Sequence, residues 1–421
     1  MAVRRRRVIG ATVLAAPLVW LTAPAPRAHA DFDDFIDPLL NAMIAVDPAI
    51  SADFGPGSAF ASLDTMFDGV YQNLVSTPIN DLEQWIFGAD SANPGSAAAS
   101  AADSAVANAV GSAEAGSSSS TPSSFTIPLV VNGGTEPVVD VSVGGGSPSS
   151  VLVDTGSAGL VLPIWDIKWS GIDWSDLGLP TIGLGSYSDS LGYVYAELPT
   201  TVSFTNSAGD TITSGTTDVD AVLFSFPMNL TTLLDGQWSI GSYLGDNAEG
   251  VLGIGANAVG PTPDHIPTTA LPGALGNGVL IDQKDGTLTF GADPLTGGVT
   301  VDGAPNSTLY VSFDGGQTAT QVSAIMDSGG VYGTVPVSLT NGSAGQVLAA
   351  GQKVSVYNGD PSNGGTLLYG YTVNSSSSDS PTIVSGSSMN TGNWLFAQNE
   401  VYVSTSGNGS LHIVSNDTAT P

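Results

Sequence analysis

Two aspartates, Asp154 and Asp327, stand in closely similar surroundings and are the residues best suited to carry chemistry. Each follows an apolar run typical of a β-strand, begins an Asp-Thr/Ser-Gly triplet, and precedes a second apolar run that ends in Pro. A single triplet of this kind is typical of a strand-ending turn, but two copies in matched surroundings indicate a paired site. The two units are Val151–Ser157 with Leu160–Pro163, and Val322–Gly330 with Val331 and Thr334–Pro336.

Two carboxyl groups that face one another would share a proton, because both cannot ionise cheaply at short distance. The ionised group could act as general base on a water molecule, while the protonated one donates to the carbonyl oxygen of a peptide bond. Hydroxyls to hold the two loops together are available from Thr155 and Ser328, and Ser157 can hydrogen-bond the first carboxylate. Gly156 and Gly329 would let the backbone turn tightly and bring an N–H to each carboxylate.

Composition excludes several other chemistries. The 421 residues include no Cys, which rules out a thiol nucleophile and a Cys-ligated metal site. The three His show no paired spacing, so we expect no His-cluster metal site. The formal net charge is −30, and this acidic balance excludes a nucleic-acid partner, which needs a basic surface. The cations beyond residue 30 are Lys168, Lys284 and Lys353.

Residues 1–30 have the layout of a secretory signal peptide. The basic stretch Arg4–Arg7 precedes the apolar stretch Val8–Leu21, and Ala28–Ala30 forms a small-x-small cleavage site. A single membrane anchor is the alternative, but the apolar stretch is short and interrupted by a proline. Because Arg5–Ile9 also fits a twin-arginine signal, both the Sec and the twin-arginine routes stay open. We expect a secreted or cell-envelope protein at the cell surface.

Three further regions differ in composition and in the spacing of their apolar residues. Residues 31–88 place apolar side chains three and four positions apart, which predicts a small helical N-terminal segment. This segment could pack on the main domain, dock a partner or the cell wall, or be a removable pro-segment. Residues 89–123 are rich in Ala, Ser and Gly, as flexible linkers are. In residues 124–421 short apolar runs alternate with turn residues, which predicts an all-β domain of two lobes, about 124–300 and 301–421.

Residues 124–415 resemble the pepsin-like aspartic protease family. Besides the two Asp units, four motifs follow in the family's order. They are similar to the strand before the first active-site loop, the flap tip, the hydrophobic-hydrophobic-Gly strand that threads this loop, and the hairpin before the lobe crossover. These motifs are Val141–Gly144 with Pro148, Ser186–Ser190, Gly250–Gly255 and Lys284–Gly291.

The resemblance implies an all-β, bilobal pepsin-like fold and an aspartic endopeptidase. It implies that Asp154 and Asp327 form the catalytic dyad and that Tyr187 is the flap tyrosine. The nucleophile would be water, so no metal or organic cofactor is expected. The substrate would be an extended polypeptide, and we expect a monomer.

A closer likeness is to the mycobacterial PecA-like aspartic proteases, which process PE-domain proteins at the cell surface. The acidic, Cys-free and Gly-rich composition and the N-terminal signal are similar to that group. The likeness implies secreted PE-domain proteins as substrates. Residues 31–88 contain no Pro-Glu pair, so the N-terminal PE domain of many relatives is not transferred to this chain.

Three positions depart from the family's pattern. Gly330 stands where the family usually has Ser, Thr or Ala, so we expect a lost hydrogen bond, a raised pKa of the dyad and activity closer to neutral pH. Val161 stands where the family often has a Trp that hydrogen-bonds the flap tyrosine, a role that Trp165 or Trp169 could take. Trp394–Phe396 stands for the second threading strand but lacks the expected Gly.

Two other functions stay open beside the peptidase. A non-catalytic pepsin-like protein would keep the cleft and bind a peptide without cutting it, and Gly330 and the missing tryptophan favour this alternative. An unrelated β-rich cell-wall or adhesion protein would carry the two triplets as turns, but it would leave the ordered motifs unexplained. The intact pair of aspartates favours the peptidase.

Overall fold

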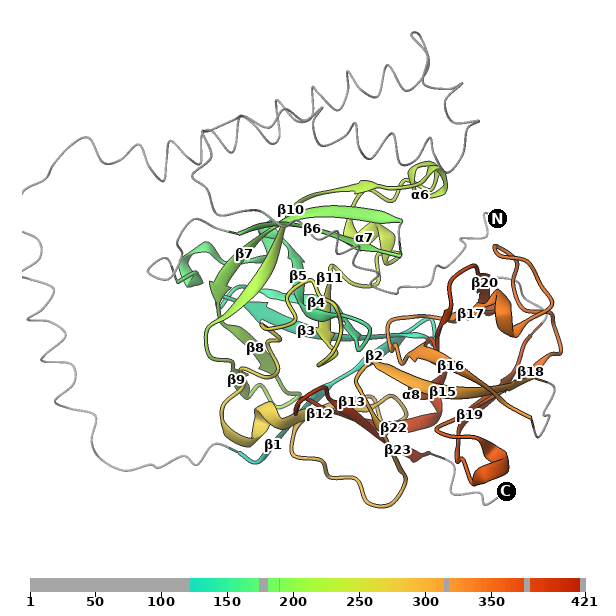
Figure 1. Ribbon diagram of the computed structural model, residues 1–421. Coiled ribbons are helices and arrows are strands. Elements are labelled where there is room, and N and C mark those ends of the chain that lie inside the picture. Colours follow the sequence, from blue (N-terminus) through green and yellow to red (C-terminus); the bar gives the residue numbers. More distant parts are fainter. Residues whose placement is uncertain (1–121, 174–180, 189, 314–317, 375–378, 417–421) are drawn as a thin grey trace, which may run out of the picture. The chain divides into compact units, whose positions relative to one another are not determined.

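The structure is a computed structural model that describes residues 122–173, 181–188, 190–313, 318–374 and 379–416 (Figure 1). The expected signal peptide (1–30) and helical segment (31–88) lie outside these residues, as does nearly all of the linker (89–123). Short strands dominate the described chain, so the predicted all-β class is confirmed. The described helices are short: α6 (Leu230–Leu234), α7 (Ile240–Tyr243), α8 (Trp394–Gln398) and the 3₁₀ helices η3 (Ile164–Asp166), η4 (Trp169–Gly171), η5 (Gly273–Asn277), η6 (Val337–Leu339) and η7 (Pro361–Asn363).

No helix in the described ranges is long and apolar enough to cross a membrane.

The largest sheet has ten strands and carries the first aspartate. Its order is β6-β7-β10-β5-β11-β4-β3-β8-β9, with β2 paired to β3. The central strands β5 and β11 are buried throughout, and β4 is buried over its last four residues, as expected of strands that are covered on both faces. The strands are β2 (Val130–Asn132), β3 (Glu136–Val143), β4 (Pro148–Asp154), β5 (Ala158–Pro163), β6 (Ile182–Tyr187), β7 (Leu191–Thr200), β8 (Val202–Thr205), β9 (Thr211–Thr213), β10 (Thr217–Pro227) and β11 (Gly250–Ile254).

A seven-stranded sheet of order β19-β18-β15-β16-β21-β17-β20 carries the second aspartate. In it β21 runs parallel to β16 and antiparallel to β17, just as β11 runs parallel to β4 and antiparallel to β5. The two sheets therefore repeat one arrangement around the two Asp units. The strands are β15 (Asn306–Phe313), β16 (Thr320–Ile325), β17 (Thr334–Pro336), β18 (Lys353–Tyr357), β19 (Leu367–Thr372), β20 (Thr382–Val384) and β21 (Ser388–Asn390).

A six-stranded sheet of order β1-β13-β12-β22-β23-β14 joins the two halves, as Figure 1 shows. Strands β12 and β22 pair antiparallel at its centre. One continuous cluster of buried side chains draws on all three sheets and includes Val153, Phe290 and Val356. Two sheets that repeat one arrangement, joined by a third, confirm the predicted bilobal organisation. The strands are β1 (Ser124–Pro128), β12 (Gly278–Asp282), β13 (Thr287–Gly291), β14 (Val299–Asp302), β22 (Asn399–Ser404) and β23 (Ser410–Ser415).

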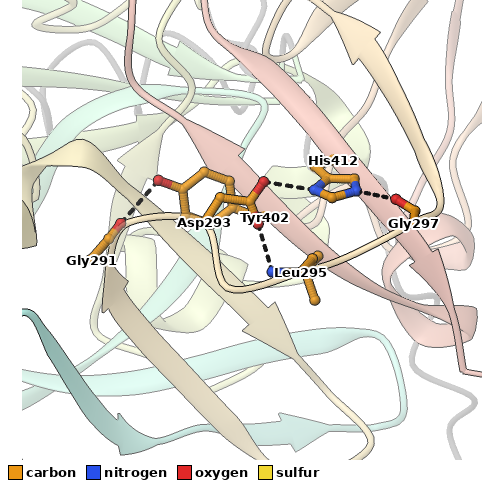
Figure 2. A network of polar contacts seen from close by, with 6 residues as sticks. All are labelled: Gly291, Asp293, Leu295, Gly297, Tyr402 and His412. Atoms are coloured by element: carbon orange, nitrogen blue, oxygen red, sulfur yellow. Dashed lines mark hydrogen bonds and ion pairs between the residues drawn. The ribbon is translucent and has the colours of Figure 1, made fainter.

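His412 on β23 holds the crossover from β13 to β14, which connects the two halves (Figure 2). Its Nδ1 lies 2.6 Å from Asp293 Oδ2, and its Nε2 lies 2.5 Å from the carbonyl oxygen of Gly297. Both partners are acceptors, so both ring nitrogens donate and the ring is an imidazolium. The bond to the Gly297 carbonyl, and next the pair with Asp293, raise the pKa of His412 above its ordinary 6.5.

The charge of His412 should make the stability of the fold depend on pH. The pKa of His412 is higher in the folded than in the unfolded protein. The stabilisation that protonated His412 gives the fold is therefore complete below the ordinary pKa of 6.5. It is lost as the pH rises through the pKa of His412 in the folded protein. We expect His412→Gln to lower the melting temperature most at about pH 5 and least at about pH 9. Thermal denaturation of both proteins across this range measures the difference, and a difference that is constant with pH would contradict the prediction.

Candidate active site

The two aspartates lie at equivalent points of the internal repeat. Asp154 is the last residue of β4, and Asp327 follows the end of β16 by two positions. Strand β11 threads the loop that carries Asp154 by lying between β4 and β5, and β21 threads the loop of Asp327 between β16 and β17. Both aspartates are completely buried.

The strand registers show which residues of the two threading strands correspond. Val251 in β11 pairs with the residues two before and seven after Asp154. Asn390 in β21 pairs with the residues at the same two offsets from Asp327. Asn390 is therefore the counterpart of Val251.

This correspondence corrects our expectation for the second threading strand. The triplet Asn390–Gly392 corresponds to Val251–Gly253, and its last residue is the Gly that the family pattern requires. Trp394–Phe396 lies in α8 instead. Sequence reasoning missed the triplet because its first two residues are polar where the pattern expects apolar side chains.

Thr155 and Ser328 lock the two loops together by reciprocal hydrogen bonds. The backbone N–H of Ser328 donates to Thr155 Oγ1 at 2.9 Å, and the backbone N–H of Thr155 donates to Ser328 Oγ at 3.0 Å. Each hydroxyl then donates onward to a backbone carbonyl of the opposite half, Thr155 to Met326 at 2.6 Å and Ser328 to Val153 at 2.7 Å. All four bonds are buried, so they fix the relative position of the two aspartates.

Every oxygen of the two carboxyl groups accepts a hydrogen bond from its own half. Asp154 Oδ1 accepts from the backbone N–H of Gly156 and Oδ2 from the hydroxyl of Ser157, both at 2.7 Å. Asp327 Oδ1 accepts from the backbone N–H of Gly329 at 2.9 Å. The structure thus brings together the predicted dyad residues and the predicted supporting residues.

The two glycines are required because each lies against the opposite carboxyl group. A Cβ at Gly156 would stand 2.6 Å from Asp327 Cγ, and a Cβ at Gly329 would stand 3.1 Å from Asp154 Cγ. The two carboxyl groups are also close enough for each to affect the pKa of the other. The loops therefore approach as closely as their backbones allow.

Burial is the largest influence on both acids. It raises the pKa of Asp154, against the hydrogen bonds from Asp327, Ser157 and Gly156, which favour the ionised form. Burial raises the pKa of Asp327 well above its usual value, and the adjacent charge of Asp154 raises it further. The pair therefore holds one proton over a wide pH range, and this titration belongs to the two acids together.

The expectation that Gly330 leaves a carboxylate one hydrogen bond short is wrong. The side-chain amide of Asn390 donates to Asp327 Oδ2 through Nδ2 at 2.6 Å. The missing hydroxyl is replaced by a donor that lies 63 residues after Asp327 in the chain. The argument that this position moves activity toward neutral pH therefore loses its basis.

The predicted flap tyrosine lies in a buried aromatic cluster. Tyr187 ends β6 and is fully buried, with its ring 5.2 Å from that of Tyr193 and 6.3 Å from that of Tyr243. The tip of its hairpin is anchored, because the backbone N–H of Met228 donates to the carbonyl of Ser190 at 2.8 Å. Burial raises the pKa of Tyr187, so its hydroxyl stays protonated.

Neither tryptophan that we considered as the partner of the flap tyrosine takes that place. Trp165 is 70% exposed and Trp169 is 41% exposed, and neither belongs to the cluster of buried side chains around Tyr187. Val161 does belong to it and is fully buried. Tyrosines of the same half, and not a tryptophan, thus pack against the flap ring.

Across the described ranges, no group of three or more His, Asp or Glu side chains is arranged to hold a metal ion.

Two buried aspartates on paired loops of a two-lobed β protein define the aspartic peptidase class of site. Residues 125–412 match the family described as the PE-PGRS C-terminal aspartyl peptidase-like domain, and the chain belongs to this family. The resemblance to the PecA-like group is thereby confirmed.

Individual relatives carry the name PE cleavage protein A. The protein of Mycobacterium marinum is 40% identical over 289 residues, which are 66% of this chain and 50% of the relative. Its namesakes in two strains of Mycobacterium tuberculosis are 42% identical over 297 residues, which are 68% of this chain and 50% of each relative. The chain thus spans about half the length of the curated relatives that it matches.

The reciprocal bonds of Thr155 predict a large cost for losing one hydroxyl. Thr155→Val keeps the shape but leaves the N–H of Ser328 and the carbonyl of Met326 without a partner in a buried place. We expect the free energy of unfolding to fall by about 1–3 kcal/mol for each of these groups. Thr155→Ser, which keeps the hydroxyl, should retain most of the stability.

Urea denaturation measures the change. Thr126→Val is a matched control, because the hydroxyl of Thr126 bonds that of Thr289 at an exposed site and its loss should change stability by no more than about 0.5 kcal/mol. Equal losses in Thr126→Val and Thr155→Val would contradict the prediction.

Proposed function

We propose that this chain is an aspartic endopeptidase in which Asp154 and Asp327 activate a water molecule. The observation that carries this proposal is the pair of fully buried carboxyl groups, one from each half, each of which lies against the glycine of the opposite loop. A protein gains nothing in stability from burying two acids side by side, so the arrangement points to function. Membership of the aspartyl peptidase-like family supports the same conclusion.

The different surroundings of the two acids assign their roles. We assign Asp154 as the ionised general base and Asp327 as the protonated general acid, because the charge of Asp154 acts to raise the pKa of Asp327. Asp154 takes a proton from water as the oxygen attacks the carbonyl carbon, while Asp327 gives its proton to the carbonyl oxygen. A tetrahedral diol results. The proton on Asp154 then passes to the amide nitrogen, the C–N bond breaks, and Asp327 recovers its proton from a hydroxyl of the diol.

The substrate that fits this site is an extended polypeptide. Such a chain would add a strand beside the flap, where main-chain bonds give affinity and side-chain contacts give selectivity. Tyr187 lies within the electrostatic influence of Asp154, so the flap would cover the reacting bond and exclude water. Because the relatives are named for PE cleavage, we extend PE proteins to this chain as its substrates.

We also propose that the protein is exported to the cell surface or released. The support is the order of a basic stretch (Arg4–Arg7), an apolar stretch (Val8–Leu21) and a small-residue cleavage site (Ala28–Ala30). An exported location would place the peptidase with secreted substrates. Both the Sec and the twin-arginine routes fit this segment.

Removing either carboxylate should abolish proteolysis. We expect Asp154→Asn and Asp327→Asn each to lower kcat by about a hundred- to ten-thousandfold on an unfolded polypeptide mixture. The wild type should show a bell-shaped pH profile, because activity requires Asp154 ionised and Asp327 protonated, and its basic limb should lie well above the ordinary pKa of 3.8.

Asp360→Asn serves as control, because this carboxylate lies in an exposed loop and its loss should leave the rate unchanged. Cleavage that survives both dyad substitutions would refute the proposal. Binding of the peptide without any cleavage by the wild type would favour the non-catalytic alternative.

The export proposal predicts the N-terminus of the mature protein. Full-length chain expressed with a C-terminal tag in a mycobacterial host should be recovered outside the cytoplasm with Asp31 as its first residue, as read by mass spectrometry. Ala30→Asp should block this processing. Replacing Arg5 and Arg6 together by Lys should stop export only if the twin-arginine route is used. Intact protein retained in the cytoplasm would refute export.

A further inference from the structure

The two halves of the site satisfy the second oxygen of each aspartate by different means. In the first half the donor is the hydroxyl of Ser157, three residues after Asp154 in the same loop. The corresponding residue of the second loop is Gly330, which has no side chain to donate. There the donor comes from the threading strand, where Asn390 stands at the position that Val251 occupies in the first half.

Neighbouring bonds fix the orientation of the Asn390 amide. Its Oδ1 accepts from the backbone N–H of Gly392 at 2.8 Å, so its Nδ2 must point the other way, toward Asp327 Oδ2 at 2.6 Å. The side chain is buried, with 7% of its surface exposed. An amide nitrogen can only donate, unlike a hydroxyl, which can also accept. The bond therefore keeps Oδ2 of Asp327 an acceptor.

Gly330 is small because Asn390 fills the space. A Cβ at Gly330 would stand 2.4 Å from Asn390 Oδ1 and 3.0 Å from Asp327 Oδ2. The φ angle of Gly330 does not lie in the left-handed region, so its backbone conformation is open to other residues. The clash, and not the backbone, excludes a serine at this position.

We propose that Asn390 is a positioning residue for peptide hydrolysis, that it holds Asp327 through Oδ2, and that Asn390 and Gly330 form a pair that can change only together. The inference rests on the proposed function for its kinetic consequences. Its structural part concerns only the geometry of Asp327.

The two halves themselves provide the test. Changing Asn390→Val and Gly330→Ser together gives the second half the Val and Ser that the first half has at these positions. Asn390→Val alone should lower kcat by about ten- to a hundredfold with little change in KM, because a donor to the reacting acid is lost. The basic limb of the pH–rate profile of Asn390→Val should move to higher pH. The bond from Asn390 favours the ionised form of Asp327 and lowers the pKa of Asp327, so its loss raises that pKa.

Gly330→Ser alone should also lose activity, through its clash with Asn390. The double variant should recover at least about tenfold over the weaker single variant, because the new hydroxyl takes over the bond to Oδ2. Additive losses in the double variant would overturn the proposal. So would a wild-type kcat and pH profile in Asn390→Val.

Asn390→Asp provides a second test of the proposal if the Asn390→Val variant does not fold. The replacement has nearly the same shape and can still accept from the N–H of Gly392. Above the pKa of the introduced carboxyl it repels Asp327 instead of donating, so activity should survive only at acid pH. An unchanged profile would refute the proposal.

Asn399→Ala separates positioning from general stability. Asn399 is also a buried asparagine, whose Nδ2 donates to the carbonyls of Leu368 at 3.1 Å and Leu395 at 2.7 Å, away from the dyad. This control should lower the melting temperature without moving the pH profile.

A readout that needs no turnover separates this inference from the proposed function. Carbon-13 NMR titration of the Asp327 carboxyl should show a higher pKa in Asn390→Val than in the wild type. A wild-type protein that cleaves nothing would refute the peptidase but not Asn390, whereas an unchanged titration of Asp327 would refute the role of Asn390.

Discussion

Two buried carboxyl groups that face one another are the constraint on which the rest of the structure depends. Ionised acids are costly to bury, and beyond residue 30 the chain contains only three lysines to offset its acids. Two of these lysines donate to the backbone carbonyls of Gly145 and Asn416. The pair is tolerated because one proton is shared and because each carboxyl oxygen accepts a hydrogen bond. These bonds hold only while the two loops keep their places.

The fold keeps the loops in place at three levels. Nearest the acids, Thr155 and Ser328 each bond the backbone of the opposite half. Around them, the buried strands β4, β5 and β11, and their counterparts β16, β17 and β21, hold each loop from both sides. Farther out, the six-stranded sheet pairs the two halves through β12 and β22, and His412 ties the crossover to β23. Each outer set of interactions restricts the movement of the set that it surrounds.

The repeat is not exact around the two acids. Two facing carboxyl groups hold one proton between them even where their surroundings match, because ionising the first makes the second harder to ionise. Asp154 receives a hydroxyl from its own loop, while Asp327 receives an amide from a distant strand. Burial raises the pKa of both acids, and the charge of Asp154 is a separate cause that also raises the pKa of Asp327. The internal repeat therefore brings the two acids together, and the two halves supply different hydrogen-bond donors to them.

Features that depend on local sequence pattern could be predicted before the structure. The apolar runs before Asp154 and Asp327 and the alternation with turn residues were enough to predict an all-β, two-lobed protein with paired acids. The distant groups that complete the site became clear from the three-dimensional arrangement alone. Asn390 reaches Asp327 because of the register of β21, and Tyr187 packs against Tyr193 because of the twist and pairing of β6 and β7. The register between strands that are far apart in sequence is set by the packing of the whole core. The residues around Asn390 therefore do not reveal which residue it will face.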